Sequence, residues 1–320
     1  MESSFHTKKY KWGNPMKKSF LLISISAAII YSACNPKKSD DTTKTSALLA
    51  LARSSSTAST STSTSTSTSS ASCQTLLGSS TTVMTNASAD YLAAVCTTPT
   101  FGTNTPTWIT ANFKCNMTTS VSGNTITISS ITSLPPYKSA YWTNSGTTAA
   151  YYESTMPTGN AVNPNKISSQ NNTITMPLAP TVNSTTTASS MGPIGVNVLG
   201  VVLYNNAAAP GDSLTTELAT MDRGYGHPTN TGSYHNHTEP CKISNNDSNL
   251  VGVMMDGFPV IGQKDADGTT PADLDAAHGH STKALSAALI AGGAPTYHYH
   301  ITASDPYILS VFRGTPGTAR

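Results

Sequence analysis

The sequence predicts a mainly β protein, an antiparallel sandwich or barrel built from two pseudo-symmetric repeats with a few short helices. Only 11% of the residues are charged, and short runs of β-branched residues recur along the chain, as is typical of β-rich proteins. A Gly-Val-x-x-x-Gly pattern starts at Gly195 and recurs at Gly252. Because a repeated unit usually buries its apolar face against its partner, we expect one domain with pseudo-two-fold symmetry.

The N-terminus has the features of an export signal. Basic residues precede an apolar run over residues 20–30, and small residues then lead to Cys34. This order predicts a secretory signal over residues 1–33, too short for a transmembrane helix, with Met16 as an alternative start. The segment resembles a bacterial lipoprotein cleavage site, of a relaxed form seen in spirochaetes, so Cys34 is the predicted lipidation site. The alternative is a secreted protein with a conventional signal.

The rest of the chain divides where its composition changes. Residues 34–72 are expected to form the lipidated cysteine and a flexible Ser/Thr-rich linker, because they hold too little apolar content to pack. Residues 73–111 are interpreted as an N-terminal extension with a short helix, and residues 112–316 as the main domain. We expect the protein in the cell envelope, anchored through its lipid to the outer or inner membrane.

Local patterns place the elements along the chain. Residues 88–96 combine an N-cap residue with helix formers, which predicts a short helix. A second helix is expected over residues 282–291, ended by Gly292 and Gly293. Alternating β-branched runs and the Gly-Val patterns predict strands over residues 125–131, 173–176, 195–203, 252–260 and 297–301.

Four cysteines remain once Cys34 is set aside: Cys73, Cys96, Cys115 and Cys241. An even number in an exported chain favours two disulfides, for which three pairings exist. We favour a Cys73–Cys96 bond closing a local loop and a Cys115–Cys241 bond tying an early strand to the later half. Cys241 lies four residues after His237, so a thiolate metal ligand is the alternative interpretation.

Seven of the eight histidines lie between His227 and His300, in a pattern that occurs twice: a Gly-His step and then Tyr-His-x-His. In a strand, residues two apart point to the same side, so both rings of His-x-His can converge on one point. The neighbouring glycine lets the backbone approach closely and bring in a third ring. The candidate metal ligands are His227, His235, His237, His280, His298 and His300. Residues placed to support them are Asp256, Tyr297, Tyr299 and His278.

Clustered imidazoles indicate metal chemistry. Neutral imidazole binds zinc and copper, the two metals we expect, and three histidines with an open fourth position form a known catalytic zinc arrangement. Without a metal, buried ring nitrogens would be left unsatisfied at about 1–3 kcal/mol each. A structural His/Tyr network and metal-free acid–base chemistry remain as alternatives. We expect the rings of both halves to gather in one shared pocket, although a duplication also permits two sites.

Two acidic features accompany the histidines. Asp256 either orients a histidine ring or fixes its own turn. The segment that holds Asp265, Asp267, Asp273 and Asp275 has carboxylates at alternate positions, but its glycine falls at the fourth position and not at the sixth. A solvated acidic turn is therefore favoured over a calcium loop.

The motifs resemble those of the bacterial YHYH-domain family. The resemblance rests on the Tyr-His-Tyr-His segment at 297–300 together with residues 255–262 and 305–314, and it covers roughly residues 112–316. The family implies no particular activity. Tyr137 stands where the resemblance predicts a histidine, so a ligand is altered here or Tyr137 replaces it.

Composition narrows the function further. The formal net charge is +2, and removal of residues 1–33 leaves 13 basic against 15 acidic residues, so nucleic acid is not an expected partner. No Gly-x-Ser-x-Gly, phosphate-loop or His-Glu-x-x-His motif is present. We predict an extracytoplasmic lipoprotein that binds a transition metal through its duplicated histidines. A metal-dependent hydrolase or oxidoreductase, and a metal-free surface or adhesion module, are the alternatives.

Overall fold

The computed structural model describes residues 73, 84–85, 88, 90–209 and 212–320. The predicted signal, the lipidation site at Cys34 and the Ser/Thr-rich linker lie outside the described residues. The described residues belong to one compact unit of the chain. They form a mainly β structure with three sheets, so this part of the predicted fold class is confirmed.

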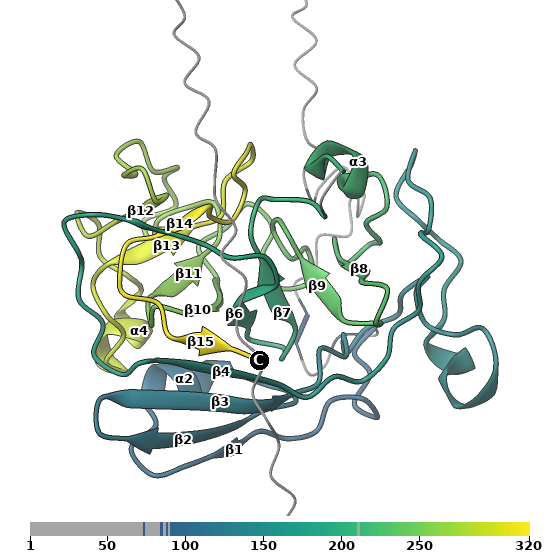
Figure 1. Cartoon of the computed structure of the whole chain (residues 1–320), viewed down its shortest axis with the longest axis horizontal. Helices are drawn as coiled ribbons and strands as arrows, with labels where there is room; N and C mark the ends of the chain where they lie inside the picture. Colours follow the sequence, from purple (N-terminus) through teal and green to yellow (C-terminus); the bar gives the residue numbers. More distant parts are fainter. Residues whose placement is uncertain (1–72, 74–83, 86–87, 89, 210–211) are drawn as a thin grey trace, which may run out of the picture. The chain divides into compact units, whose positions relative to one another are not determined.

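An eight-stranded sheet forms the larger part of the fold (Figure 1). Its strands, in spatial order, are β12 (Gly279–His280), β13 (His298–His300), β11 (Pro259–Ile261), β10 (Leu250–Met254), β6 (Pro193–Asn197), β7 (Val202–Tyr204), β9 (Tyr234–Asn236) and β8 (His227–Pro228). The β11–β13 and β7–β9 pairs are parallel and the others are antiparallel. The sheet is therefore mixed, and no closed barrel forms among the described residues, which corrects that alternative.

The order and direction of strand pairing are the same when they are followed inward from either edge of this sheet. A two-residue Gly-His or His-Pro strand lies antiparallel to a His-x-His strand, which lies parallel to the second strand of a hairpin. Each hairpin comes from one Gly-Val pattern, and the turns are made by Gly200 (φ 73°) and Gly257 (φ 88°), where glycine is strongly favoured. The first strands of the two hairpins, β6 and β10, pair with each other at the centre.

A smaller five-stranded sheet lies beside the first in Figure 1. Its order is β1 (Thr100–Phe101), β2 (Thr118–Ser122), β3 (Thr125–Ile131), β4 (Asn172–Pro177) and β15 (Thr318–Ala319). Strand β3 spans the residues predicted for it, and Ile126 and Ile128 alternate with more exposed neighbours, as expected for a strand with one buried face. These side chains share one buried cluster with Val196 and Val253 of the larger sheet. Strands β5 (Thr187–Ala188) and β14 (Val311–Phe312) form a separate pair.

The described helices are short. They are α2 (Thr107–Asn112), the 3-10 helix η1 (Gly146–Tyr151), α3 (Leu214–Leu218) and α4 (Ala287–Ala291). The helix predicted at residues 282–291 begins later than expected and ends before Gly292, as predicted. The described residues of 88–96 form turns, so that predicted helix is wrong. Tyr91 N–H donates to Ser88 and Val95 N–H to Leu92, which are three-residue turn contacts that do not continue into a helix.

Two disulfides form, as the cysteine count predicts, but the favoured pairing is wrong. Cys73 bonds Cys241, and Cys96 bonds Cys115. The second pair is only 19 residues apart, and the Asn116 side chain accepts hydrogen bonds from the N–H and hydroxyl groups of Thr97, which holds the two segments together beside the bond. The disulfide of Cys241 also excludes it as a thiolate ligand. Two disulfides are typical of an extracytoplasmic protein.

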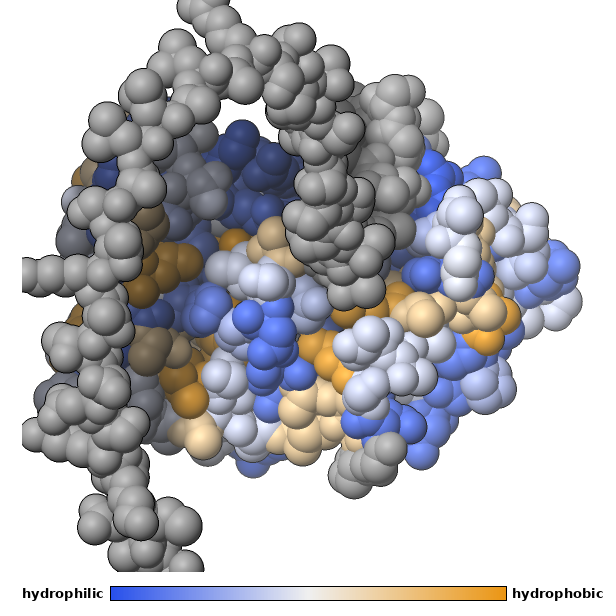
Figure 2. Space-filling model, turned by 90° about the horizontal axis from the view of Figure 1, so that it is seen from above, coloured by the Kyte–Doolittle hydropathy of each residue, from blue (hydrophilic) through white to orange (hydrophobic). Residues whose placement is uncertain are grey.

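Figure 2 shows hydrophobic patches interspersed with hydrophilic residues on the visible, described part of one face. The exposed large hydrophobic residues among those described are Val162, Val182, Met191 and Ile290. No helix of the described part of the chain has the length and apolar character needed to cross a membrane.

Candidate metal centres

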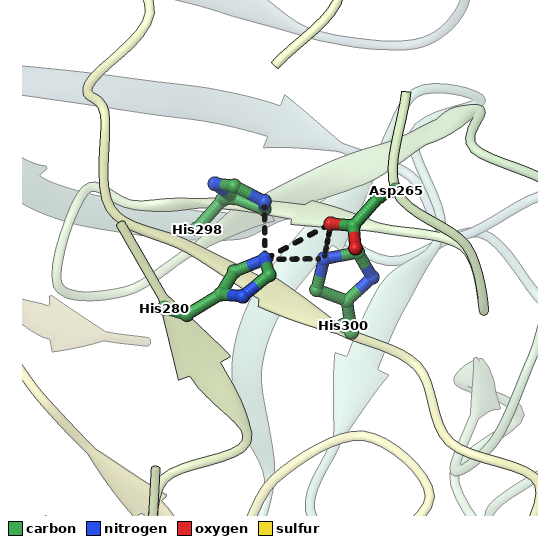
Figure 3. A group of neighbouring side chains, drawn as sticks. All are labelled: Asp265, His280, His298 and His300. Carbon is green, nitrogen blue, oxygen red and sulfur yellow. Dashed lines mark hydrogen bonds and ion pairs between the residues drawn. The ribbon is translucent and has the colours of Figure 1, made fainter. Parts of the chain in front are cut away.

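Three histidines and one aspartate meet at the β12–β13 edge of the large sheet (Figure 3). We define the second histidine cluster as His280, His298 and His300 together with Asp265. All four side chains are at most 4% exposed. His280 Nε2 lies 3.1 Å from His298 Nε2 and 3.2 Å from His300 Nε2. Asp265 Oδ1 lies 3.1 Å from His280 Nε2 and 3.4 Å from His300 Nε2.

The outward nitrogens of this cluster are held by acceptors. His298 Nδ1 lies 2.9 Å from the Thr296 carbonyl oxygen, and His300 Nδ1 lies 2.8 Å from the Gly262 carbonyl oxygen. His280 Nδ1 faces the Asp273 carboxylate at 2.9 Å. Because a carbonyl or carboxylate oxygen only accepts, each Nδ1 carries the proton and each Nε2 turns a lone pair toward the centre.

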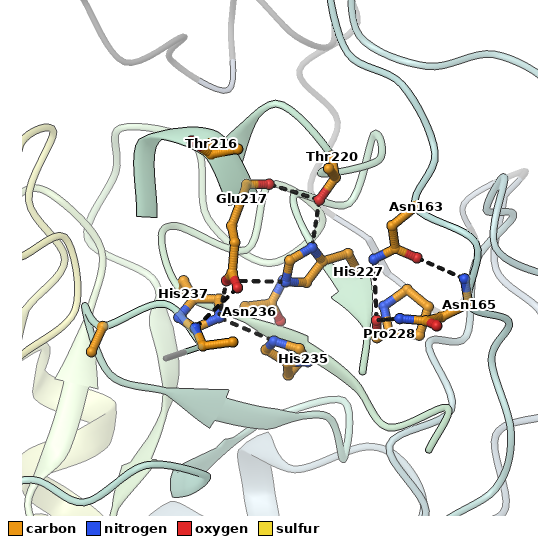
Figure 4. Close-up of polar contacts among 12 residues, drawn as sticks. Asn163, Asn165, Thr216, Glu217, Thr220, His227, Pro228, His235, Asn236 and His237 are labelled. Atoms are coloured by element: carbon orange, nitrogen blue, oxygen red, sulfur yellow. Dashed lines mark hydrogen bonds and ion pairs between the residues drawn. The ribbon is translucent and has the colours of Figure 1, made fainter. Parts of the chain in front are cut away.

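The first histidine cluster, His227, His235 and His237, lies at the opposite edge of the sheet (Figure 4). His235 Nε2 and His237 Nε2 are 3.0 Å apart. The Nδ1 atoms of His235 and His237 lie 3.0 Å and 2.6 Å from the carbonyl oxygens of Ser233 and Asn205. Hence these two Nδ1 atoms carry the protons, and here too the Nε2 lone pairs face inward.

A carboxylate approaches the first cluster as well. Glu217 Oε2, on helix α3, lies 3.3 Å from His237 Nε2 and 3.7 Å from His227 Nε2. His227 Nδ1 lies 2.6 Å from the Thr220 hydroxyl, which itself donates to the Glu217 carbonyl oxygen. The donor atoms that lie within 4.8 Å of one another are those of the three histidines alone, and Glu217 is outside that group.

The spacing of these atoms suits a metal ion. In a tetrahedral zinc site with bonds of about 2.0–2.1 Å, neighbouring ligand atoms are about 3.3 Å apart. Four distances among the Nε2 atoms and Asp265 Oδ1 of the second cluster are between 3.1 and 3.4 Å, close to this ligand spacing. Two lone pairs facing each other at such distances repel unless a proton or a cation lies between them.

Protonation is disfavoured at both clusters. Burial lowers the pKa of His227 to about 3 and the pKa of His300 to about 4, and neighbouring histidines act in the same direction. Burial also lowers the pKa of His235, His237 and His298. For these five rings a lowered pKa disfavours a shared proton, and a bound cation can satisfy the inward lone pairs instead. Either cluster could hold one.

The tyrosine that begins each His motif supports the turn before the Gly-His step. Tyr234 donates to Asp222 Oδ1 at 2.6 Å, and this oxygen also accepts from the Gly226 N–H. Gly226 has to lack a side chain, because a Cβ there would lie 2.6 Å from the Tyr234 ring. In the second half, Tyr297 donates to Asp275, and a Cβ on Gly279 would lie 2.3 Å from the Tyr297 hydroxyl.

The structure places the other predicted residues away from the inward nitrogens. Asp256 accepts from the Tyr299 hydroxyl and the Gly314 N–H, and it also accepts from Phe258 within its own turn. His278 adopts a left-handed conformation with φ 62°, and its Nδ1 has no hydrogen-bond partner. Tyr137 donates to the Tyr234 hydroxyl at 3.4 Å, so it does not replace a ligand within the first cluster.

The expectation of one shared pocket is wrong. The six predicted histidines gather as two groups of three, because each Tyr-His-x-His strand pairs with the Gly-His strand of its own half at its own edge of the sheet. The pairs β8–β9 and β12–β13 are separated by the two central hairpins.

Two carboxylates near the clusters differ from the expectation from sequence. Asp265, expected in a solvated acidic turn, is 2% exposed and neither of its oxygens accepts a hydrogen bond. Glu217 has no distinguishing pattern in the sequence, since a single acidic residue on a short helix is ordinary. The carboxylates at alternate positions around Asp265 are the signal from which a buried carboxylate could be predicted.

A cavity of about 520 Å³ adjoins the first cluster. Its lining includes all three histidines of that cluster, together with Glu217 and the ring of Tyr204. Tyr204 stacks on His235 with ring centroids 4.0 Å apart. No residue of the second cluster lines this cavity.

Residues 173–271 match the family model described as YHYH protein, and the chain therefore carries a domain of this family. The matched segment contains the whole first cluster and Asp265, whereas the three histidines of the second cluster lie beyond it. Neither the curated proteins nor the solved structures compared with this chain include a match.

Proposed function

We propose that this protein binds two divalent transition-metal ions outside the cytoplasm, one in each histidine cluster. The proposal rests on a single observation: in both clusters the Nδ1 atoms are held from behind by oxygen partners, and the Nε2 atoms converge. Such oxygen partners orient metal-binding imidazoles and raise their basicity. Burial without a cation would leave several lone pairs opposed, at about 1–3 kcal/mol for each unsatisfied group.

The donor set favours zinc or copper. Three imidazoles, with or without a carboxylate, suit both metals, whereas magnesium and calcium prefer oxygen-only shells. The contacts of 3.1–3.4 Å in the second cluster match four-coordinate zinc. Octahedral magnesium, with bonds of about 2.0–2.1 Å, would bring neighbouring ligand atoms to about 2.9 Å.

Duplication of one unit is part of this proposal. Three pairs of residues lie opposite each other in the central strands: Asn197 and Gly252, Val196 and Val253, Gly195 and Met254. If each residue of the first half corresponds to the one 57 positions later, Val196 faces its own counterpart, and the pairs on either side are exchanged. This is the register that a two-fold axis between Val196 and Val253 would produce.

The supporting hydrogen bonds also recur in the two halves, at offsets of 57 residues for one set and 53 for the other. Asn205 and Gly262, which are 57 residues apart, supply the carbonyl oxygens behind His237 and His300. The Asp222 and Asp275 N–H groups donate to the glycine before the metal-binding histidine in each half. A single ancestral unit with one metal site accounts for both observations.

The cell envelope is the compartment we propose, with attachment through a lipid on Cys34. The two disulfides support an oxidising compartment. The lipid is supported by the sequence before Cys34 alone. Mass spectrometry of the purified protein tests it: a diacylated N-terminal Cys34 is expected, and a mature chain that begins at any other residue contradicts the anchor.

Metal content tests the metal function. The full-length protein, dialysed against chelator-free buffer, is expected to hold about two transition-metal ions per chain by elemental analysis. The double variant His298→Gln/His300→Gln should hold one, since it removes two ligands of the second cluster only.

His278→Asn provides a matched control. It removes a histidine two residues from His280 that is outside both clusters, and asparagine tolerates the positive φ of 62° at this position. This variant should retain both ions. Less than about a tenth of an equivalent of metal in the folded protein, before and after incubation with zinc or copper, would refute the proposal.

A further inference from the structure

The two clusters differ in how the fourth position around the ion is filled. In the second cluster, Asp265 Oδ1 lies at ligand spacing from two ring nitrogens and neither carboxylate oxygen has a hydrogen-bond partner. A buried carboxylate without a partner is costly, so coordination to the ion is its natural role. Three histidines and this aspartate complete a four-coordinate shell, which is the form of structural zinc sites.

Among the described residues, the first cluster has no fourth donor placed as Asp265 is. Glu217 Oε2 lies 3.3 Å from His237 Nε2 but 3.7 Å from His227 Nε2, so it is at ligand spacing from only one ring and lies outside the group of mutually close donor atoms. Its other oxygen accepts a hydrogen bond from the N–H of Ala209, which precedes helix α3, at 3.2 Å. This contact directs one carboxylate oxygen away from the cluster. Three histidine ligands with an open position are the form of catalytic zinc sites.

The open side of the first cluster faces a cavity. The cavity of about 520 Å³ reaches all three of its histidines and falls within the 300–1,000 Å³ typical of small-molecule sites. Figure 4 shows the three rings and Glu217 converging. His227 lies on β8, His235 on β9, His237 directly after β9, and Glu217 on helix α3. The second cluster contributes no residue to this cavity.

We propose that the first cluster presents an exchangeable coordination position to a small organic ligand in this cavity, while the second cluster holds a closed, structural ion. This inference rests on the metal-binding function proposed above and assigns different roles to its two sites. The ligand we infer is partly apolar and binds the metal through one anionic group such as a carboxylate or hydroxamate.

The cavity lining supports that ligand class. Apolar wall is supplied by Met191, Tyr204, Ala207, Ala209 and Pro228. Among the described residues that line the cavity there is no lysine or arginine, and Asp212 and Glu217 are acidic. A phosphate or other multiply charged ligand would therefore lack the cationic partners that usually bind it. A single anionic group can instead be neutralised by the ion itself.

Cobalt substitution tests the difference between the sites. The full-length chain is loaded with Co²⁺, the content is confirmed as two ions by elemental analysis, and azide is added while the visible ligand-field bands are recorded. We expect the bands of one ion to shift, with saturation at one azide per chain. Benzohydroxamate, which carries an aromatic ring, should compete with azide at the same ion.

Variants assign the responding ion. His235→Gln/His237→Gln should abolish the azide response and leave one cobalt ion bound, whereas His298→Gln/His300→Gln should leave the response intact. Ala207→Trp, which narrows the cavity without touching a ligand, should weaken benzohydroxamate binding at least tenfold while both cobalt ions stay bound.

Three outcomes distinguish failure of this inference from failure of the proposed metal-binding function. Two bound cobalt ions with no response to azide would overturn the open position and leave metal binding intact. A response that disappears with the second-cluster variant instead of the first would reverse the assignment. Failure of the folded chain to bind cobalt at all would remove the proposed function and this inference with it.

Glu217→Gln provides a further check on the empty fourth position. If Glu217 is not a ligand, the variant keeps two cobalt ions and binds one azide, because the histidines still hold the ion. Loss of the first ion in this variant would show that Glu217 closes the shell, and would overturn the proposal.

Discussion

At the scale of the residue, burial determines how strongly a proton competes with a metal ion for each histidine. The three rings of the first cluster are at most 5% exposed, and burial lowers the pKa of all three, to about 3 for His227. A proton competes with a metal only below the pKa of the folded site. Because that pKa is lowered, competition begins at a more acidic pH than for exposed histidines.

The first prediction concerns this pH dependence. Between pH 7.5 and 5.5, an exposed three-histidine site with pKa values of about 6.5 would lose about a thousandfold in metal affinity. The first cluster is expected to lose much less than this, since burial lowers the pKa of all three rings and shifts their protonation to more acidic pH. Competition titration with a chromophoric chelator on His298→Gln/His300→Gln, which leaves only this cluster, measures the change. A loss near a thousandfold would contradict the assigned burial effect.

The second prediction compares the two tyrosines that begin the His motifs. Tyr234→Phe removes a donor to Asp222, which is 0% exposed, whereas Tyr297→Phe removes a donor to Asp275, whose side chain is 33% exposed. A lost hydrogen bond to a buried carboxyl group costs about 1.5–3 kcal/mol, and water can replace part of it at the more exposed site.

Urea unfolding of the metal-loaded protein measures both changes. We expect Tyr234→Phe to lower the free energy of unfolding by more than Tyr297→Phe. The matched positions serve as controls for each other, since both substitutions delete one hydroxyl from corresponding residues. An equal or reversed order would show that exposure of the carboxyl group does not decide the effect.

At the scale of the element, the central strand pair depends on two glycines. A Cβ at Gly252 would lie 2.2 Å from the Val196 carbonyl oxygen, and a Cβ at Gly195 would lie 2.6 Å from the Val253 carbonyl oxygen. The obstacle in each case is backbone and cannot rotate away. The strands can therefore approach as they do only without these side chains.

The third prediction follows from this contact. Gly252→Ala and Gly195→Ala should each lower the free energy of unfolding by about 1–3 kcal/mol through overpacking, with the larger effect at Gly252, where the contact is shorter. Thermal and urea unfolding with intact disulfides measure the loss. Stability unchanged within about 0.5 kcal/mol in both variants would be incompatible with this register.

Local sequence patterns predict several strands and part of the histidine geometry. The β-branched alternation placed β3 at residues 125–131, and His-x-His spacing put pairs of rings on one side of a strand. The disulfide pairing and the separation into two clusters depend on which strands become neighbours. Spacing along the chain does not determine which strands become neighbours. Each His-x-His strand pairs in parallel with a strand of its hairpin, and a long connection separates the two paired strands in the sequence.

At the scale of the whole molecule, both histidine clusters lie at sheet edges that have little backbone pairing. Strands β8 and β12 are two residues long, so few ladder hydrogen bonds hold them. In each cluster one histidine comes from this short strand. The other two come from the neighbouring strand, except that His237 directly follows β9. A bound ion would thus join the last two strands at each edge, whereas the described strands at the centre of the sheet and in the five-stranded sheet contribute no residue to either cluster.

The fourth prediction concerns which regions loosen when the metal is removed. At a free metal concentration of 100 times Kd, binding stabilises a site by about 2.7 kcal/mol, or about a hundredfold in its opening equilibrium. Chelation should therefore speed amide exchange up to that extent in β8, β9, β12 and β13. The central β6–β10 pair and strands β2–β4 should change less than threefold, because their amides open through other routes. Hydrogen-exchange mass spectrometry of metal-loaded and chelated protein, with zinc added back as the control for reversibility, measures both. Uniform acceleration across both sheets would mean that the ions support the global fold, and no acceleration at either edge would mean that they do not join these strands.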